Sequence, residues 1–248
     1  MGVEVKIVAD NATLNRTAAL EFHRVAEAAV GDRGRFSVAL SGGNTPRGVY
    51  SLLAEEHKEL PWDRVHIFFG DERHVPPEHA DSNFRMTSES LLTRVPIPDK
   101  NIHRVRAELD ANSAAQDYAE QLRQFFPTTN NDWPRFDLVL LGLGDDGHTA
   151  SLFPGTAALN DGSGTVAANW VEKLQSFRIT LTFPVLNHAA EVIFLVSGEN
   201  KAEILNDVFR PGAKKYPSQW VQPENGRLLW LVDQDAARLL RSSAPPSR

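Results

Sequence analysis

Short runs of consecutive apolar residues recur along the chain, and they constrain its fold more than any other feature. The segments Phe-Asp-Leu-Val-Leu-Leu-Gly and Val-Ile-Phe-Leu-Val-Ser are apolar on successive residues instead of on every second one. This pattern is typical of strands buried on both faces, as in a parallel sheet covered by helices. The strands predicted in this way are Val5–Val8, Phe36–Leu40, Val65–Phe69, Leu138–Leu143, Ile179–Phe183, Val192–Val196 and Leu228–Val232.

Segments with apolar residues at helical spacing lie between most of these runs. The predicted helices are Thr13–Val30, Thr45–Glu56, Ser82–Thr93, Ser113–Phe126, Asn200–Phe209 and Gln234–Arg241. This alternation predicts an α/β fold, with an open and mainly parallel central sheet between two layers of helices. We expect one domain over residues 1–241 and a frayed Ser/Pro-rich tail at 242–248. We also expect a surface loop at 127–134 and a flexible segment at 155–168.

Composition narrows the functional classes. The 248 residues include 26 Lys and Arg against 32 Asp and Glu, a formal net charge of −6, and no basic run stands out. A protein that grips nucleic acid normally carries a basic face, so we expect no nucleic-acid partner. The absence of cysteine excludes thiol catalysis, Cys-ligated zinc and disulfides. No stretch resembles a signal peptide or reaches the roughly 20 apolar residues of a bilayer helix. We therefore expect a cytoplasmic protein that binds no membrane and is a monomer rather than an obligate oligomer.

The first candidate site follows the strand predicted at 36–40. Ligands of open α/β sheets bind outside the carboxyl ends of the strands. Two glycines permit close backbone approach here, and Thr45 with Pro46 fits a helix N-cap and first helical residue. Amide groups at a helix N-terminus bind phosphate well, although an ordinary strand-to-helix turn is the alternative. The predicted phosphate-binding residues are Ser41, Gly42, Gly43, Asn44 and Thr45.

The second candidate site follows the strand predicted at 65–69. Asp71, Glu72, Arg73 and His74 are four consecutive ionisable residues. Arg73 could bind an anion or polarise a carbonyl, and Asp71 or Glu72 could transfer protons or orient a neighbour. The alternative is a solvated loop with an internal ion pair.

The third candidate site is the glycine-rich loop after the strand predicted at 138–143. It contains Asp145, Asp146 and His148. A neutral imidazole, with an ordinary pKa of about 6.5, is the best natural match to a general base near neutral pH. Asp146 could orient the ring of His148 because a glycine turn brings residues two apart together. This loop therefore predicts an acid–base centre.

Two later cations are further candidates. Lys201 follows the strand predicted at 192–196 and could reach a phosphate at the same end of the sheet, while Arg178 is a weaker candidate; a solvated position is the alternative for both. His74 and His79 have no third metal-ligating partner, and the other histidines lack motif context. We predict no required metal.

Taken together, these turns resemble the 6-phosphogluconolactonase family from about residue 5 to residue 240. The carrying segments are Ser41–Pro46, Gly70–Pro76 with Asp81–Asn83, Gly142–Pro154, Phe177–Thr182 and Ser197–Lys201. The resemblance implies hydrolysis of the sugar-phosphate lactone 6-phospho-D-glucono-1,5-lactone to 6-phosphogluconate, in the oxidative pentose phosphate pathway and without a cofactor. It also implies an α/β sandwich related to glucosamine-6-phosphate deaminases. His148 would be the general base, Ser41–Thr45 and Lys201 would hold the phosphate, and Arg73 would lie near the lactone oxygens.

Two other functions remain open. A deaminase or isomerase acting on a 6-phospho-amino sugar shares Asp71, Asp146 and His148. Such enzymes carry a tyrosine in place of Arg73 and a glutamate in place of Phe153, so these positions favour the lactonase. A non-catalytic sugar-phosphate sensor is the third possibility. For the lactonase, either Arg73 or the backbone N–H groups of residues 142–147 would stabilise the oxyanion.

Overall fold

The computed structural model describes residues 2–126, 133–162, 164–212 and 214–240, and its centre is a parallel sheet. Six strands lie in the order β1-β9-β8-β5-β2-β3. Their bounds are β1 (Val3–Val8), β2 (Phe36–Leu40), β3 (Val65–Phe69), β5 (Leu138–Leu141), β8 (Glu191–Val196) and β9 (Arg227–Asp233). Every residue of β2 and β5 is buried, as consecutive apolar residues predict. The predicted parallel sheet is confirmed.

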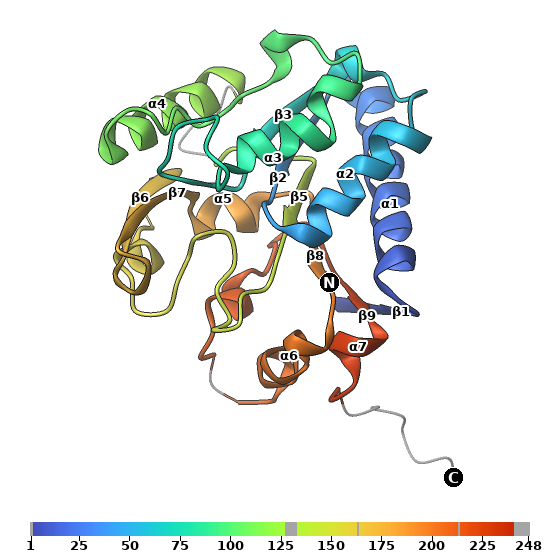
Figure 1. Ribbon diagram of the computed structural model, residues 1–248, viewed down its shortest axis with the longest axis vertical. Coiled ribbons are helices and arrows are strands. Elements are labelled where there is room, and N and C mark those ends of the chain that lie inside the picture. The colour runs from blue at the N-terminus through green and yellow to red at the C-terminus, as the bar shows by residue number, and fades with distance from the viewer. Residues whose placement is uncertain (1, 127–132, 163, 213, 241–248) are drawn as a thin grey trace.

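The helices lie mostly where apolar periodicity predicts them (Figure 1). They are α1 (Asn11–Arg33), α2 (Asn44–Glu56), α3 (Asn83–Ser90), α4 (Ala111–Phe125), α5 (Phe183–His188), α6 (Ala202–Phe209) and α7 (Gln234–Ala237). Short 3₁₀ helices cover Trp62–Arg64, Leu92–Arg94, Asp99–Asn101, Ala157–Asn160, Glu172–Leu174, Glu199–Lys201 and Pro217–Trp220. Residues 200 and 201, predicted as α-helical, therefore belong to a 3₁₀ turn before α6. α7 ends at Ala237, earlier than predicted.

Aromatic contacts show that helices cover both faces of the sheet. Phe36 pairs with Val65 in the parallel register, so Phe68, three residues further along β3, points to the opposite face. Phe36 packs edge-on against Phe22 of α1, with ring centroids 5.1 Å apart. Phe68 packs against Phe125 of α4 at 5.0 Å. The three-layer arrangement is therefore confirmed.

A second, three-stranded sheet corrects one prediction. It consists of β4 (Asp71–Arg73), β7 (Ser176–Leu181) and β6 (Val166–Val171), paired antiparallel in the order β4-β7-β6. The run predicted at Ile179–Phe183 belongs here and not to the parallel sheet, and Phe183 begins α5 instead. Its residues are consecutively buried because helix α4 packs against this small sheet, which lies beside α4 in Figure 1.

Two strands of the second sheet were not predicted. β4 consists of three ionisable residues, which no apolar pattern marks. β6 begins inside the segment expected to be flexible, whose other described residues include the 3₁₀ turn Ala157–Asn160. Buried and less buried residues alternate along β6, but alanine occurs at both kinds of position, so the sequence shows no apolar alternation. The tail at 242–248 and residues 127–132 of the expected loop lie outside the described residues.

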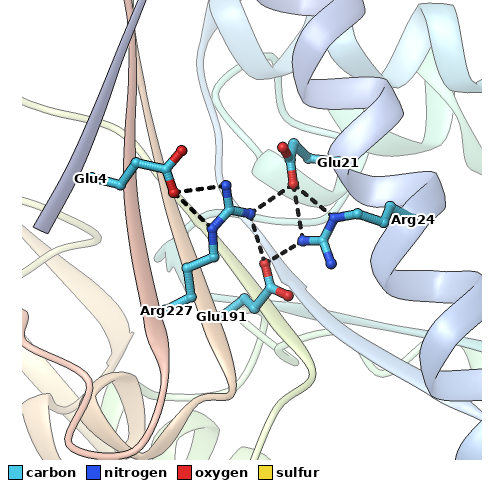
Figure 2. A network of polar contacts seen from close by, with 5 residues as sticks. All are labelled: Glu4, Glu21, Arg24, Glu191 and Arg227. Atoms are coloured by element: carbon cyan, nitrogen blue, oxygen red, sulfur yellow. Dashed lines mark hydrogen bonds and ion pairs between the residues drawn. The ribbon is translucent and has the colours of Figure 1, made fainter. Parts of the chain in front are cut away.

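The amino ends of the strands are tied together by ion pairs (Figure 2). Arg227, at the start of β9, contacts Glu4 of β1, Glu21 of α1 and Glu191 of β8 at 2.8–3.2 Å. Arg24 of α1 adds contacts to Glu21 at 2.9 Å and Glu191 at 2.6 Å. This network, which we call the amino-end network, joins three strands to α1.

The buried apolar residues form one core cluster that includes residues of the sheet and of the helices on both of its faces. Within the described residues, no helix combines the length and apolar character needed to cross a membrane.

Candidate active site

A cavity of about 500 Å³ lies where the three predicted turns meet. The turns follow β2, β3 and β5, which are neighbours in the parallel sheet, so their carboxyl ends meet at one edge. Eight of the residues predicted from sequence line this cavity: Ser41, Gly42, Gly43, Asp71, Arg73, His148, Arg178 and Lys201. The fold therefore brings together segments more than a hundred residues apart in the chain.

The imidazole of His148 is held by Asp146. The Nδ1 atom of His148 lies 2.5 Å from Oδ1 of Asp146, and the backbone N–H of His148 donates to the same oxygen at 3.2 Å. Phe153 stacks on the imidazole, with ring centroids 4.0 Å apart and planes 25° apart. The side chain of His148 remains 26% exposed, so water reaches it. With Nδ1–H donating to the carboxylate, Nε2 is the ring nitrogen left to accept a proton.

The electrostatics of this pair keep the imidazole neutral and the carboxylate charged. Burial lowers the pKa of His148 and outweighs the opposing effect of the Asp146 carboxylate. Burial alone would raise the pKa of Asp146, but hydrogen bonds from Lys173 and His148 outweigh it and lower that pKa to about 2. A neutral imidazole beside a charged carboxylate is the protonation state that a general base requires.

The glycines of this loop allow the histidine to lie against the backbone. A Cβ atom at Gly144 would lie 2.0 Å from Cε1 and Nδ1 of His148, so a larger residue would displace the ring. The loop is also tied back to its surroundings, since Thr149 Oγ1 donates to Gly142 O at 2.9 Å and Ser151 Oγ donates to Asp71 Oδ2 at 2.6 Å. Ala150 has a positive φ of 46°, which places a strained residue beside this pair.

The small antiparallel sheet sets two arginines side by side. Arg73 of β4 is directly opposite Arg178 of β7, so both side chains lie on the same face, toward the cavity. Arg73 donates to the backbone oxygen of Asp81 at 2.5 Å, and Arg178 donates to the oxygen of Phe177 at 3.0 Å. Burial and the neighbouring Arg73 lower the pKa of Arg178. Among the described residues neither guanidinium pairs with a carboxylate, so both are available to an anionic ligand.

The alternation of strand β4 separates the roles of its two acidic residues. Asp71 shares the face of Arg73 and lines the cavity, whereas Glu72 points the other way and is only 2% exposed. Glu72 accepts hydrogen bonds from the backbone N–H groups of Asn83 and Phe84 at 2.7 and 2.8 Å. Burial raises the pKa of Glu72 despite these bonds. Glu72 therefore holds the start of α3, and the acid–base role considered for it is not supported.

The turn after β2 differs in detail from the prediction. The N-cap of α2 is Gly43, with a φ of 113°, and not Thr45, because the helix already begins at Asn44. Asn44 and Thr45 are not among the residues that line the cavity. Ser41 does line it, and its buried Oγ has no hydrogen-bond partner among the described residues. The cavity side of this turn is therefore formed by Ser41, Gly42 and Gly43.

Two lysines complete the positive charge of the cavity. Lys201 lines it and pairs with Asp145, whose side chain is 78% exposed. Lys173, which sequence reasoning missed, also lines the cavity and pairs with Asp146, and it lies over the Phe153 ring with its Nζ 4.7 Å from the centroid. Lys173 belongs to the turn between β6 and β7, and no motif in the sequence marks it. Ser151 and Phe153 also line the cavity, and they lie in the segment Gly142–Pro154 that the sequence analysis singled out.

Among the described residues, the cavity contains no group of three His, Asp or Glu ligand atoms close enough to share a metal ion. The prediction that no metal is required stays a prediction.

Comparison with known proteins identifies the relatives of this chain. A family model described as glucosamine-6-phosphate isomerases/6-phosphogluconolactonase matches residues 9–230. A 6-phosphogluconolactonase of Synechocystis is 45% identical over 216 residues, covering 86% of this chain and 88% of the relative. The rat 6-phosphogluconolactonase is 40% identical over 234 residues, covering 90% and 88%. The solved 6-phosphogluconolactonase of Trypanosoma cruzi has a TM-score of 0.87 at 30% identity, covering 97% of both chains. A monomeric glucosamine-6-phosphate deaminase shares the fold, with a TM-score of 0.80 at 17% identity.

Proposed function

This chain belongs to the family of glucosamine-6-phosphate isomerases and 6-phosphogluconolactonases, and we propose that within this family it is a 6-phosphogluconolactonase. It is then a carboxylic ester hydrolase that converts 6-phospho-D-glucono-1,5-lactone to 6-phosphogluconate in the oxidative pentose phosphate pathway. The observation that carries this proposal is the imidazole of His148, held by Asp146, in a cavity lined by four cationic side chains.

His148 acts as the general base. Its Nε2 takes a proton from a water molecule, whose oxygen forms a bond to the lactone carbonyl carbon. The tetrahedral intermediate then breaks the bond between that carbon and the ring oxygen, and the imidazolium returns the proton to the ring oxygen as it leaves. Asp146 keeps Nδ1 protonated throughout, so that Nε2 carries the lone pair at the start. Such base assistance is worth about 10²–10⁴-fold in rate.

Arg73 is the better of the two oxyanion donors considered. The N–H of Gly144 already donates to the oxygen of His148 at 2.9 Å, and the N–H of Gly147 donates to the oxygen of Gly144 at 2.9 Å. Two of the N–H groups of residues 142–147 are therefore engaged within the loop. The Arg73 guanidinium faces the cavity without a carboxylate partner and would stabilise the charge that develops on the carbonyl oxygen by about 3 kcal/mol.

The phosphate of the substrate binds at Ser41, Gly42 and Gly43, with Lys201 as its cation. The hydroxyl of Ser41 is without a partner, and the first amides of α2 have no acceptor within the helix. Anchoring the remote phosphate orients the lactone ring toward His148. The described residues of one chain supply all of these groups, so the proposed site does not need a second subunit, and a small anionic metabolite fits the expected cytoplasmic location.

The residue that stacks on His148 argues against amino-sugar deamination. Phe153 is 5% exposed and occupies the position at which, by the resemblance described above, deaminases carry a glutamate. An apolar ring cannot pass protons during ring opening, whereas lactone hydrolysis does not require this group. The identities of 40–46% to lactonases agree with this choice.

The direct test generates the lactone from glucose 6-phosphate with its dehydrogenase and follows the release of 6-phosphogluconate with and without the protein. We expect release faster than the spontaneous rate. Release at the spontaneous rate, together with consumption of glucosamine 6-phosphate, would establish the deaminase instead. Binding of 6-phosphogluconate without turnover of the lactone would establish a sensor.

A further inference from the structure

Three side chains with metal-binding atoms meet outside the cavity. His23 lies in the middle of α1, His57 is the residue at which α2 ends, and Glu59 follows two residues later. The Nδ1 atoms of the two histidines are 2.9 Å apart. Oε1 of Glu59 lies 3.3 Å from Nδ1 of His23 and 3.6 Å from Nδ1 of His57. We call these three residues the His23–Glu59 cluster.

The spacing of this cluster fits one tetrahedral ion. The three distances average about 3.3 Å, which is the edge of a tetrahedron whose corners lie about 2.0 Å from its centre, the bond length of zinc to nitrogen and oxygen ligands. One point therefore lies at bonding distance from all three atoms, and water can take the fourth corner. The Glu59 side chain is 61% exposed, so the cluster is open to solvent on that side.

The surroundings of the cluster are those of a metal ligand set. The side chains of His23 and His57 are 19% and 11% exposed, so they are ordered by packing. The other ring nitrogen of His23, Nε2, lies 3.1 Å from Oε1 of Glu27. A carboxylate on the far nitrogen of a ligating histidine fixes the ring and strengthens its donor nitrogen. Without a metal, one of the two Nδ1 atoms must carry the hydrogen that the other accepts.

We propose that the His23–Glu59 cluster binds a divalent transition metal, with Zn²⁺ as the ion that best matches its geometry and its nitrogen and oxygen ligands. The ion joins α1 to the end of α2. Helix α2 runs from the Ser41–Gly43 turn to His57 over 13 residues, which is about 20 Å. The cluster therefore lies at the opposite end of α2 from the cavity, and the ion stabilises the fold without entering the lactonase reaction.

The sequence contains no spacing signal for this site. His23 and His57 are 34 residues apart, and they meet only because α1 and α2 pack side by side (Figure 1). A second histidine pair provides a matched comparison, since His66 Nδ1 and His103 Nε2 lie 3.3 Å apart. Among the described residues this second pair has no carboxylate near enough to complete a metal-binding group.

The test titrates the untagged, chelator-treated protein with Zn²⁺ by calorimetry and with Co²⁺ by visible absorption, because tetrahedral Co²⁺ has a distinctive spectrum. We expect one equivalent of Zn²⁺ to bind and to raise Tm by about 5–10 °C at a hundredfold excess over Kd. Glu59→Gln changes an exposed side chain and keeps its shape, so the variant should fold. It should weaken binding at least about tenfold, as should His23→Gln.

Two control variants make the outcome decisive. His66→Gln removes a histidine from the pair without a carboxylate, and His148→Gln removes the histidine of the cavity. Unchanged Zn²⁺ binding in both controls, with weaker binding in Glu59→Gln and His23→Gln, supports the proposal. The absence of binding to the unsubstituted protein would overturn it, as would binding that survives Glu59→Gln and His23→Gln or disappears with His148→Gln.

Discussion

The charged side chains at the two ends of the parallel sheet are arranged in opposite ways. At the amino ends of the strands, Arg24 and Arg227 share three carboxylates in the amino-end network. At the carboxyl ends, Arg73 and Arg178 lie side by side and, within the described residues, have no carboxylate partner. In the first arrangement every charged group has an oppositely charged partner within the protein. The second leaves positive charge for a ligand to neutralise.

This difference indicates where the sheet supports the fold and where it supports chemistry. Paired charges hold elements together, and the unpaired arginines raise the electrostatic energy of the unliganded protein until an anion binds. Substitutions at the two ends should therefore have separable effects. Those in the cavity should change turnover more than stability, and those in the amino-end network should do the reverse.

The largest expected effect comes from His148→Gln. Glutamine keeps a polar side chain but has no basic nitrogen, so kcat should fall by about 10²–10⁴-fold. Tm should change little, since the imidazole is partly exposed. Rates with in situ lactone, corrected for spontaneous hydrolysis, measure this effect. A kcat within a few fold of that of the unsubstituted protein would show that His148 is not the general base.

Arg73→Met should have the next largest effect on catalysis. The loss of one oxyanion donor costs about 10²–10³-fold in kcat. The substitution also removes a positive charge next to Arg178, so the free energy of unfolding should stay the same or increase. Kinetics and denaturant unfolding on the same preparation test both expectations. An unchanged kcat would indicate that the backbone N–H groups of the glycine loop stabilise the oxyanion instead.

Lys201→Met tests the phosphate end of the cavity. A hydrogen bond to a charged group is worth about 1.5–3 kcal/mol, so KM for the phosphorylated lactone should rise by about 10–100-fold with a smaller change in kcat. Unphosphorylated gluconolactone serves as the control substrate, since its KM should not respond. Equal increases in KM for both lactones would show that Lys201 does not contact the phosphate.

Arg227→Met is the counterpart of Arg73→Met at the other end of the sheet. It leaves Glu21 and Glu191, whose side chains are 15% and 17% exposed, without one of their cations. We expect a loss of roughly 1–3 kcal/mol in the free energy of unfolding, between the values for exposed and buried ion pairs. Activity at 25 °C should be unchanged. A fall in kcat comparable to that of Arg73→Met would contradict the separation of the two ends.

The central sheet was predictable because strands that are buried on both faces consist of consecutive apolar residues, which can be recognised in the sequence. Phe36–Leu40 and Leu138–Leu141 are apolar or small at every buried position, as expected of strands covered on both faces. The small sheet was not predictable in the same way. Glu72 is buried in β4, but backbone N–H groups satisfy it, and such bonds depend on the helix that follows.

The candidate site shows the same division. His148 and Arg73 were found because polar residues directly after an apolar strand must lie at the sheet edge. Lys173 was missed and Arg178 was only a weaker candidate, because both reach the cavity through the antiparallel sheet and their positions depend on pairing between distant segments. Thr45 was misassigned as the N-cap because a Thr-Pro pair fits that position locally, whereas Gly43, with its positive φ, takes it.

The smallest expected effect is a shift in the pH profile, and it tests the electrostatics of the cavity directly. Burial lowers the pKa of His148 below its ordinary value, so kcat should stay high as pH falls to about 6.5 and decline only below it. The folded protein binds this proton less tightly than the unfolded chain, so stability from this residue is also lost as pH falls through the same range.

Lys173→Met should shift the decline of kcat at low pH to a higher pH. The ammonium group of Lys173 opposes the protonation of His148, and it also pairs with Asp146. Without it, the carboxylate of Asp146 acts on the imidazole alone, so the pKa of His148 should rise and kcat should begin to fall at a higher pH. Lys100→Met, at an exposed lysine of the 3₁₀ turn Asp99–Asn101, is the matched control and should leave this decline in place. If the decline of kcat at low pH is the same in Lys173→Met as in the unsubstituted protein, another group sets the pH dependence. The comparison of the two ends would then rest on Arg73 and Lys201.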